Sequence, residues 1–138
     1  MLKIIGSVER CALKELGISK IDARIDTGAK SSSLQATNIV AFKKKKEKWV
    51  RFEVNYVLDG NPISIICETP VLTRRRVKTS NENSEKRLMI KTPMTIGDIT
   101  YDIELNLANR ESMEYQMLLG REALNDRFLI NPSESFLL

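Results

Sequence analysis

Between Val50 and Leu58 the sequence VRFEVNYVL places an apolar residue at every second position. Side chains of a strand alternate between two faces, whereas a helix repeats every 3.6 residues, so this stretch indicates a β-strand with one buried face. The tripeptide Asp59-Gly60-Asn61 follows as a turn signal, and Ile63 and Ile65 resume the alternation. We therefore predict a β-hairpin over residues 49–67.

A second hairpin is predicted further along the chain. The apolar positions from Leu88 to Ile96 lead to Gly97-Asp98, after which alternation resumes from Tyr101 to Leu107. The best helix signal, Arg121–Phe128, covers about two turns, too few to organise a helical fold. With 138 residues, the chain fits one mostly β domain spanning residues 1–138.

Charge is clustered rather than spread. The net charge is +4, with runs at Lys43–Lys46 and Arg74–Arg76. Because aromatic residues are not interleaved with the lysines for base stacking, we interpret that run as a solvated hairpin tip that protects a strand edge, and nucleic acid is not an expected partner. A basic RNA-associated protein is the alternative that these charges leave open.

The apolar runs, the first residues and the two cysteines indicate the cellular location that we expect. No apolar run reaches the roughly 20 residues of a membrane span, and the first residues do not resemble a signal peptide, so we expect no membrane association and a cytoplasmic location. Cys11 and Cys67 form no CxxC pair. They are expected to be buried thiols, with a disulfide as the other option.

A single aspartate stands at the end of a predicted strand. Ile21, Ala23 and Ile25 alternate with polar residues and deliver Asp26 to the strand end. Ionising a carboxylate there requires donors, and Thr27-Gly28 would supply a hydroxyl and close backbone N–H groups. Since Asp and Gly are also common turn formers, this triplet alone is equally consistent with an ordinary β-turn.

A second motif makes the triplet more specific. The apolar run Met117–Leu119 meets Gly120 and Arg121 and then the predicted helix. The combination of Asp-Thr-Gly-Ala after one strand with apolar-apolar-Gly-Arg after another resembles the retropepsin-like aspartic proteases. Within them the chain is most similar to the bacterial and archaeal family labelled ATP-dependent zinc proteases, which is often associated with ATP-grasp ligases that modify ribosomal protein tails. The resemblance runs almost end to end.

The resemblance implies a fold and a partner. The fold would be a closed, retropepsin-like β-barrel with one short C-terminal helix, in which Leu119, Gly120 and Arg121 support the site. An ATP-grasp ligase would be a partner. The sequence gives the zinc and ATP of the family label no support, because it has no histidine and no glycine-rich phosphate loop. We expect no metal and no cofactor.

Two positions depart from the pattern. Family members commonly carry a histidine where this chain has Gln35. Viral retropepsins have an acid that pairs with the Gly-Arg arginine at the place of Lys30. Arg121 is therefore expected to pair with Asp126 or Glu122, or else to cap backbone carbonyls.

The resemblance implies peptide-bond hydrolysis by Asp26. Two carboxylates sharing a proton are needed to activate water, and one short chain supplies one of them, so Asp26, Thr27 and Gly28 would form the catalytic turn of a homodimer. Ala29 and Lys30 would border the substrate. The serines Ser31–Ser33 have no histidine base and are expected to line the next strand.

Substrate recognition is placed with a flap between Val71 and Leu88. An exposed, mobile loop is predicted over Thr79–Arg87. Arg74, Arg75 and Arg76 would then bind the substrate and select acidic peptides such as glutamate-rich tails. The alternative function is a non-catalytic dimeric module that binds peptides and acts with the ligase.

Overall fold

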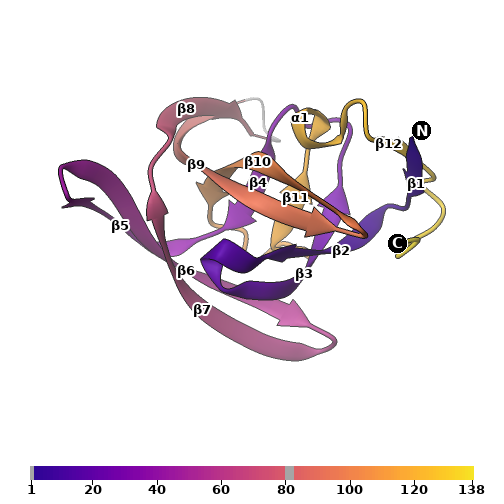
Figure 1. Ribbon diagram of the computed structural model, residues 1–138, viewed down its shortest axis with the longest axis horizontal. Coiled ribbons are helices and arrows are strands. Elements are labelled where there is room, and N and C mark those ends of the chain that lie inside the picture. The colour runs from indigo at the N-terminus through magenta and orange to yellow at the C-terminus, as the bar shows by residue number, and fades with distance from the viewer. Residues whose placement is uncertain (1, 80–82) are drawn as a thin grey trace.

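The computed structural model describes residues 2–79 and 83–138 (Figure 1). Within these residues it contains strands, one short 3₁₀-helix η1 and one short α-helix α1. Their bounds are β1 (Lys3–Ile5), β2 (Val8–Leu13), η1 (Lys14–Leu16), β3 (Ile18–Ile25), β4 (Ser32–Gln35), β5 (Thr37–Lys44), β6 (Glu47–Leu58), β7 (Asn61–Pro70), β8 (Thr73–Lys78), β9 (Ser84–Ile96), β10 (Ile99–Ala108), β11 (Met117–Leu119), α1 (Arg121–Leu124) and β12 (Phe128–Ile130).

Six of the strands close into a mixed barrel. Their order is β10-β4-β11-β3-β2-β9, and pairing of β9 with β10 closes the ring. Strand β11 runs parallel to β3, and β4 runs parallel to β10. About two thirds of the chain, 64%, is strand. The expected mostly β, retropepsin-like closed barrel with one short C-terminal helix is thus confirmed.

A three-stranded sheet, β5-β6-β7, lies along one side of the barrel, with β7 at the bottom of Figure 1 and the β5 hairpin projecting to the left. Val50, Phe52 and Val54 on β6 are fully buried, as the alternation predicted. Strands β6 and β7 pair from Trp49 to Pro70 around the turn Asp59-Gly60, where both residues have positive φ. The predicted hairpin over 49–67 is therefore confirmed.

The second predicted hairpin is also confirmed. Strands β9 and β10 pair without a register shift, and Gly97 supplies a positive φ of 61° at the turn. Both strands bury alternate side chains in the hydrophobic core, including Ile90, Met94 and Leu105.

The polar segment Thr79–Arg87 differs from the prediction of a loop. Ser84–Arg87 belong to β9 and pair with Arg75–Lys78 of β8. A strand forms there because β8 offers a ladder of backbone partners, which outweighs a polar sequence with little intrinsic preference for a strand. The rest of the predicted loop includes residues 80–82, which lie outside the described residues.

The predicted helix Arg121–Phe128 is too long. Helix α1 ends at Leu124, and Phe128 already begins β12. Asp126 has a positive φ of 67°, a left-handed conformation that cannot continue a right-handed helix. The chain then turns so that β12 can pair in parallel with β1.

Other sequence predictions concern single groups. Cys11 and Cys67 are free and buried, as expected. Lys45 and Lys46 form the turn between β5 and β6, which confirms the hairpin tip. Among the described residues, no helix has the length and apolar character needed to cross a membrane.

Candidate active site

Asp26 lies where two parallel strands of the barrel end together. Ile25, the last residue of β3, is in register with Leu119, the last residue of β11. The N–H of Asp26 donates to the carbonyl of Leu119 at 2.9 Å. The Asp26 side chain is half-buried, so its carboxylate is partly accessible to solvent. The barrel wall thus fixes where this carboxylate stands.

A tight turn carries the chain onward from Asp26. The N–H of Gly28 donates to Asp26 Oδ1 at 2.9 Å, and the N–H of Ala29 donates to the Asp26 carbonyl at 3.2 Å. Thr27, Gly28 and Lys30 are exposed, whereas Ala29 is half-buried. The structure therefore brings all five sequence-predicted residues of this segment into one turn, with a backbone donor on the carboxylate.

The Gly-Arg motif packs directly against this turn. Arg121 Nη1 donates to the carbonyl of Thr27 at 2.9 Å, and the N–H of Arg121 donates to the carbonyl of Ala29 at 2.8 Å. Of the alternatives for Arg121, the structure shows the backbone carbonyl rather than Asp126 or Glu122. Its guanidinium therefore links α1 to the turn that follows Asp26.

Gly120 is required by a close approach of backbone. A Cβ placed on it would lie 2.4 Å from the carbonyl oxygen of Ser31 and 2.9 Å from that of Ala29. Its N–H donates to Ser32 Oγ at 3.0 Å. A side chain at position 120 would therefore push apart the two segments that hold the Asp26 turn.

Asn106 on β10 was not singled out from the sequence. Its side chain is fully buried, and its Nδ2 donates to the Ser32 carbonyl at 2.9 Å and to Ser31 Oγ at 3.2 Å. Its Oδ1 accepts from Ser33 Oγ at 2.7 Å and from Arg87 Nη1 at 2.9 Å. One amide thus joins the serine run after the turn to β9. Outward alternation on β10 predicts a solvated residue, so the sequence holds no signal for this role.

Arg110, which interacts electrostatically with Asp26, was not predicted as a site residue. Arg110 is half-buried; burial and the nearby Arg87 charge lower the pKa of its guanidinium, and the Asp26 charge opposes them. The Arg110 N–H donates to Oε1 of the fully buried Gln35. Gln35 Nε2 has no hydrogen-bond partner among the described residues. The neighbourhood of Asp26 therefore contains the guanidinium of Arg110, and Arg87 lies next to that guanidinium.

Arg74, Arg75 and Arg76 lie on β8, outside the turn. Successive side chains of a strand point to opposite faces, so Arg75 faces away from the other two. Arg75 Nη1 lies 3.3 Å from Oε1 of Glu104, an exposed ion pair. The three arginines are consequently not equivalent, and only Arg74 and Arg76 share a face.

The zinc of the family label was tested against the donor groups. The chain has no histidine, and within residues 2–79 and 83–138 no three Cys, Asp or Glu side chains gather as metal ligands would. Cys11 and Cys67 lie in different sheets. Catalytic zinc takes about three protein ligands, so these residues do not fit that ion.

The closed barrel with an aspartate turn at the end of β3 is the architecture of a retropepsin-like protein. A family model described as RimB-like, retropepsin-like aspartic endopeptidase RimB, matches residues 4–138. The chain therefore belongs to the RimB-like family, which confirms the resemblance drawn from the sequence.

Similar proteins extend this comparison. A probable alpha-L-glutamate ligase of Shewanella pealeana is 47% identical over 135 residues, covering 98% of this chain and 30% of the relative. One of Desulfotalea psychrophila is 47% identical over 131 residues, covering 95% and 28%. The chain thus spans less than a third of these curated relatives. The crystal structure of Lpg0085, a Legionella pneumophila protein of unknown function, matches with a TM-score of 0.77 and 31% identity, covering 98% of this chain and 97% of that one.

Proposed function

We propose that the protein is an aspartic-type endopeptidase in which Asp26 acts together with Asp26 of a second copy. The observation that carries this proposal is the half-buried Asp26 carboxylate, which accepts the Gly28 N–H and is held at the barrel end by Leu119. A carboxylate fixed by backbone groups and open to solvent on one side can meet a partner carboxylate without reorganisation.

The chemistry needs two carboxylates about 3 Å apart that share one proton. The anionic one takes a proton from water while the neutral one donates to the scissile carbonyl oxygen, giving a tetrahedral diol. Collapse of the diol breaks the C–N bond, and the leaving nitrogen takes up a proton from the pair. In a two-fold dimer, Thr27 would hydrogen-bond across the axis while Ala29 and Lys30 border the bound peptide.

We infer acidic peptides as substrates from the charges around the turn. Arg110 interacts electrostatically with both Asp26 and Arg87, and Arg74–Arg76 lie on the β8–β9 hairpin, where a flap is proposed. The relatives named probable alpha-L-glutamate ligase contain a region similar to almost the whole of this chain. The proposed setting is therefore the cytoplasm, in association with an ATP-grasp ligase, on peptides rich in glutamate.

The second candidate function is a dimeric peptide-binding module that does not cut. The observation in its favour is that the turn of one chain contains one carboxylate, so the cleft can bind while the dyad is incomplete. Binding without cleavage would then serve the ligase partner.

Cleavage of a diverse peptide mixture tests the choice. The protein is incubated across about pH 4 to 8, where a carboxylate pair titrates, and products are read by mass spectrometry. Defined cuts are expected that disappear in Asp26→Asn, persist in the matched control Asp102→Asn, an exposed residue on β10, and persist with a chelator. Sedimentation of the same samples reports dimerisation. Cuts that survive in Asp26→Asn would overturn the proposal, and a dimer without cuts would favour the binding module.

A further inference from the structure

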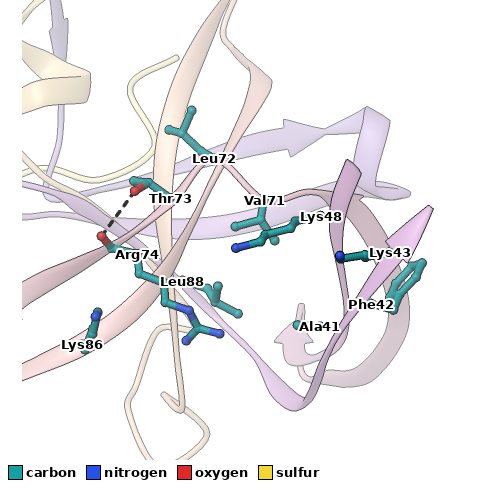
Figure 2. Close-up of a pocket in the computed structure, with 10 residues that line it drawn as sticks. All are labelled: Ala41, Phe42, Lys43, Lys48, Val71, Leu72, Thr73, Arg74, Lys86 and Leu88. Atoms are coloured by element: carbon teal, nitrogen blue, oxygen red, sulfur yellow. Dashed lines mark hydrogen bonds between the residues drawn. The ribbon is translucent and has the colours of Figure 1, made fainter. Parts of the chain in front are cut away.

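A hollow of about 610 Å³ lies between the β5–β6 hairpin and the β8–β9 hairpin. We propose that this hollow, here called the basic groove, binds an extended acidic peptide segment, as a second recognition site apart from Asp26. The bound segment would be a remote part of the substrate, so this assignment rests on the proposed function. Its lining residues are Ala41, Phe42, Lys43, Lys48, Val71, Leu72, Thr73, Arg74, Lys86 and Leu88 (Figure 2).

The charge of the basic groove is of one sign. Lys43 and Lys48 come from one hairpin, Arg74 and Lys86 come from the other, and no carboxylate among the described residues lines the hollow. All four side chains are exposed, and none has an ion-pair partner within residues 2–79 and 83–138. Four unpaired cations around one hollow attract an anionic chain, and the attraction weakens as salt rises.

The pairing of β8 with β9 places Arg74, Arg76 and Lys86 on one face of the hairpin. Arg74 is directly opposite Leu88, and Arg76 is directly opposite Lys86, so these two pairs of side chains lie on the same face of the hairpin. The other face carries Arg75, whose charge is paired with Glu104. The hairpin therefore directs its unpaired charge toward the groove.

Two open strand edges favour a peptide over RNA. Strand β8 is the last strand of its sheet, and β5 is an outer strand of the three-stranded sheet. In the described part of the chain, β8 pairs only with β9, so its outer edge retains unpaired backbone N–H and carbonyl groups. An extended peptide can add to such an edge as a further strand, which a nucleic acid cannot do.

The apolar lining narrows the ligand further. Lysines alone would suffice to protect a strand edge, but Phe42, Val71 and Leu88 also line this hollow. Figure 2 shows Arg74, Lys86 and Leu88 on one side, with Phe42 and Lys43 on the other. The segment that fits is therefore glutamate-rich and carries an apolar side chain among its acids.

Binding is measured with the Asp26→Asn protein, because this variant separates recognition from cleavage. The probe is a fluorescein-labelled peptide of glutamates interrupted by leucines, followed by fluorescence anisotropy. Arg74→Gln combined with Lys86→Gln is expected to weaken binding at least about tenfold. The matched control, Lys14→Gln combined with Lys91→Gln, removes the same charge at exposed positions that do not line the groove and is expected to change binding less than about twofold. Thermal unfolding verifies that both variants are folded.

Two further probes decide the nature of the ligand. A peptide with alternate N-methyl groups, which cannot pair with a strand edge, is expected to lose binding. A single-stranded RNA of equal charge is expected to compete weakly. The basic groove assignment would be overturned by three results: equal loss in both double variants, RNA that competes as well as the peptide, or a peptide that does not bind. Since none of these outcomes involves cleavage, failure of the groove is distinguishable from failure of the peptidase.

Discussion

The Asp26 turn and the β8–β9 hairpin are both polar, but they are held in different ways. Asp26 is held by backbone groups of Leu119, Gly28 and Ala29, which hydrogen-bond to its main chain or its carboxylate. The Arg121 side chain adds a hydrogen bond to the turn from α1. On the hairpin, Arg74 and Lys86 have no ion-pair partner among the described residues. Polar groups fixed by the backbone suit chemistry, which needs a set position, whereas free cations suit recognition, which tolerates adjustment.

The largest effect is expected from Gly120→Ala. Its added methyl group would overlap the backbone of Ser31 and Ala29, so the free energy of unfolding should fall by about 3 kcal/mol or more. Urea unfolding measures this. Gly60→Asn is the control, because nothing lies within 4 Å of its added Cβ and asparagine tolerates the positive φ. Equal urea midpoints for Gly120→Ala and Gly60→Asn would show that the Asp26 turn is not tightly packed against Gly120.

Removing the buried amide should have the next largest effect. Asn106→Ala deletes the partner of the Ser32 carbonyl and of Ser33 Oγ inside the protein, so we expect a loss of about 2–3 kcal/mol in the free energy of unfolding. Asn55→Ala is the comparison, since Asn55 bonds the exposed Glu111 at 3.2 Å. A calorimetric melt in which Asn106→Ala is no less stable than Asn55→Ala would contradict the role given to Asn106.

Alkaline pH should weaken the barrel through a buried thiol. Burial raises the pKa of Cys11 from 9.0 to about 12. The folded state keeps a proton that the unfolded chain loses, so this stabilisation is complete below pH 9 and is lost as pH rises toward 12. At about pH 10 the loss should be about 1 kcal/mol.

The Cys11→Ala variant isolates that thiol. It should start less stable, because a buried side chain is shortened, but its stability should decline less between about pH 8 and 10. Urea unfolding at each pH provides the measurement. Identical alkaline slopes in the two proteins would assign the decline to other groups.

The smallest effect is expected on the hairpin. Arg74→Gln combined with Lys86→Gln should change the free energy of unfolding by less than about 0.5 kcal/mol, since exposed charges without partners contribute little to stability. The same protein would still lose peptide binding. A melting temperature well below that of the parent would show that these side chains support the fold and would remove the contrast between the two regions.

The elements that sequence predicts well are those whose signal is local. The first hairpin is specified by the alternation from Val50 to Leu58 and by the Asp59-Gly60 turn, and these two signals are adjacent in the sequence. The segment Ser84–Arg87 became a strand only because β8 pairs with it. Likewise, α1 ended early because Asp126 reverses the chain toward β12.

The site residues also divide into those with a local sequence signal and those whose role depends on long-range contacts. Asp26 and the Gly-Arg motif were found because their residue types and spacing are specific. Asn106 escaped notice because its burial depends on the parallel pairing of β4 with β10, which joins positions far apart in sequence. Arg121 left several partners open because only the folded chain brings the Thr27 carbonyl within 2.9 Å of its guanidinium.

Strand β9 has a mechanical consequence. It runs without interruption from Ser84 on the hairpin to Ile96 in the barrel wall. Its second half is clamped between β2 and β10, while its first half is paired with β8. The hairpin is therefore attached to the barrel through one continuous strand that is held on both sides only in its second half. A ligand bound at Lys86 can shift the first half of β9 while the second half, and with it the register of the barrel, stays in place.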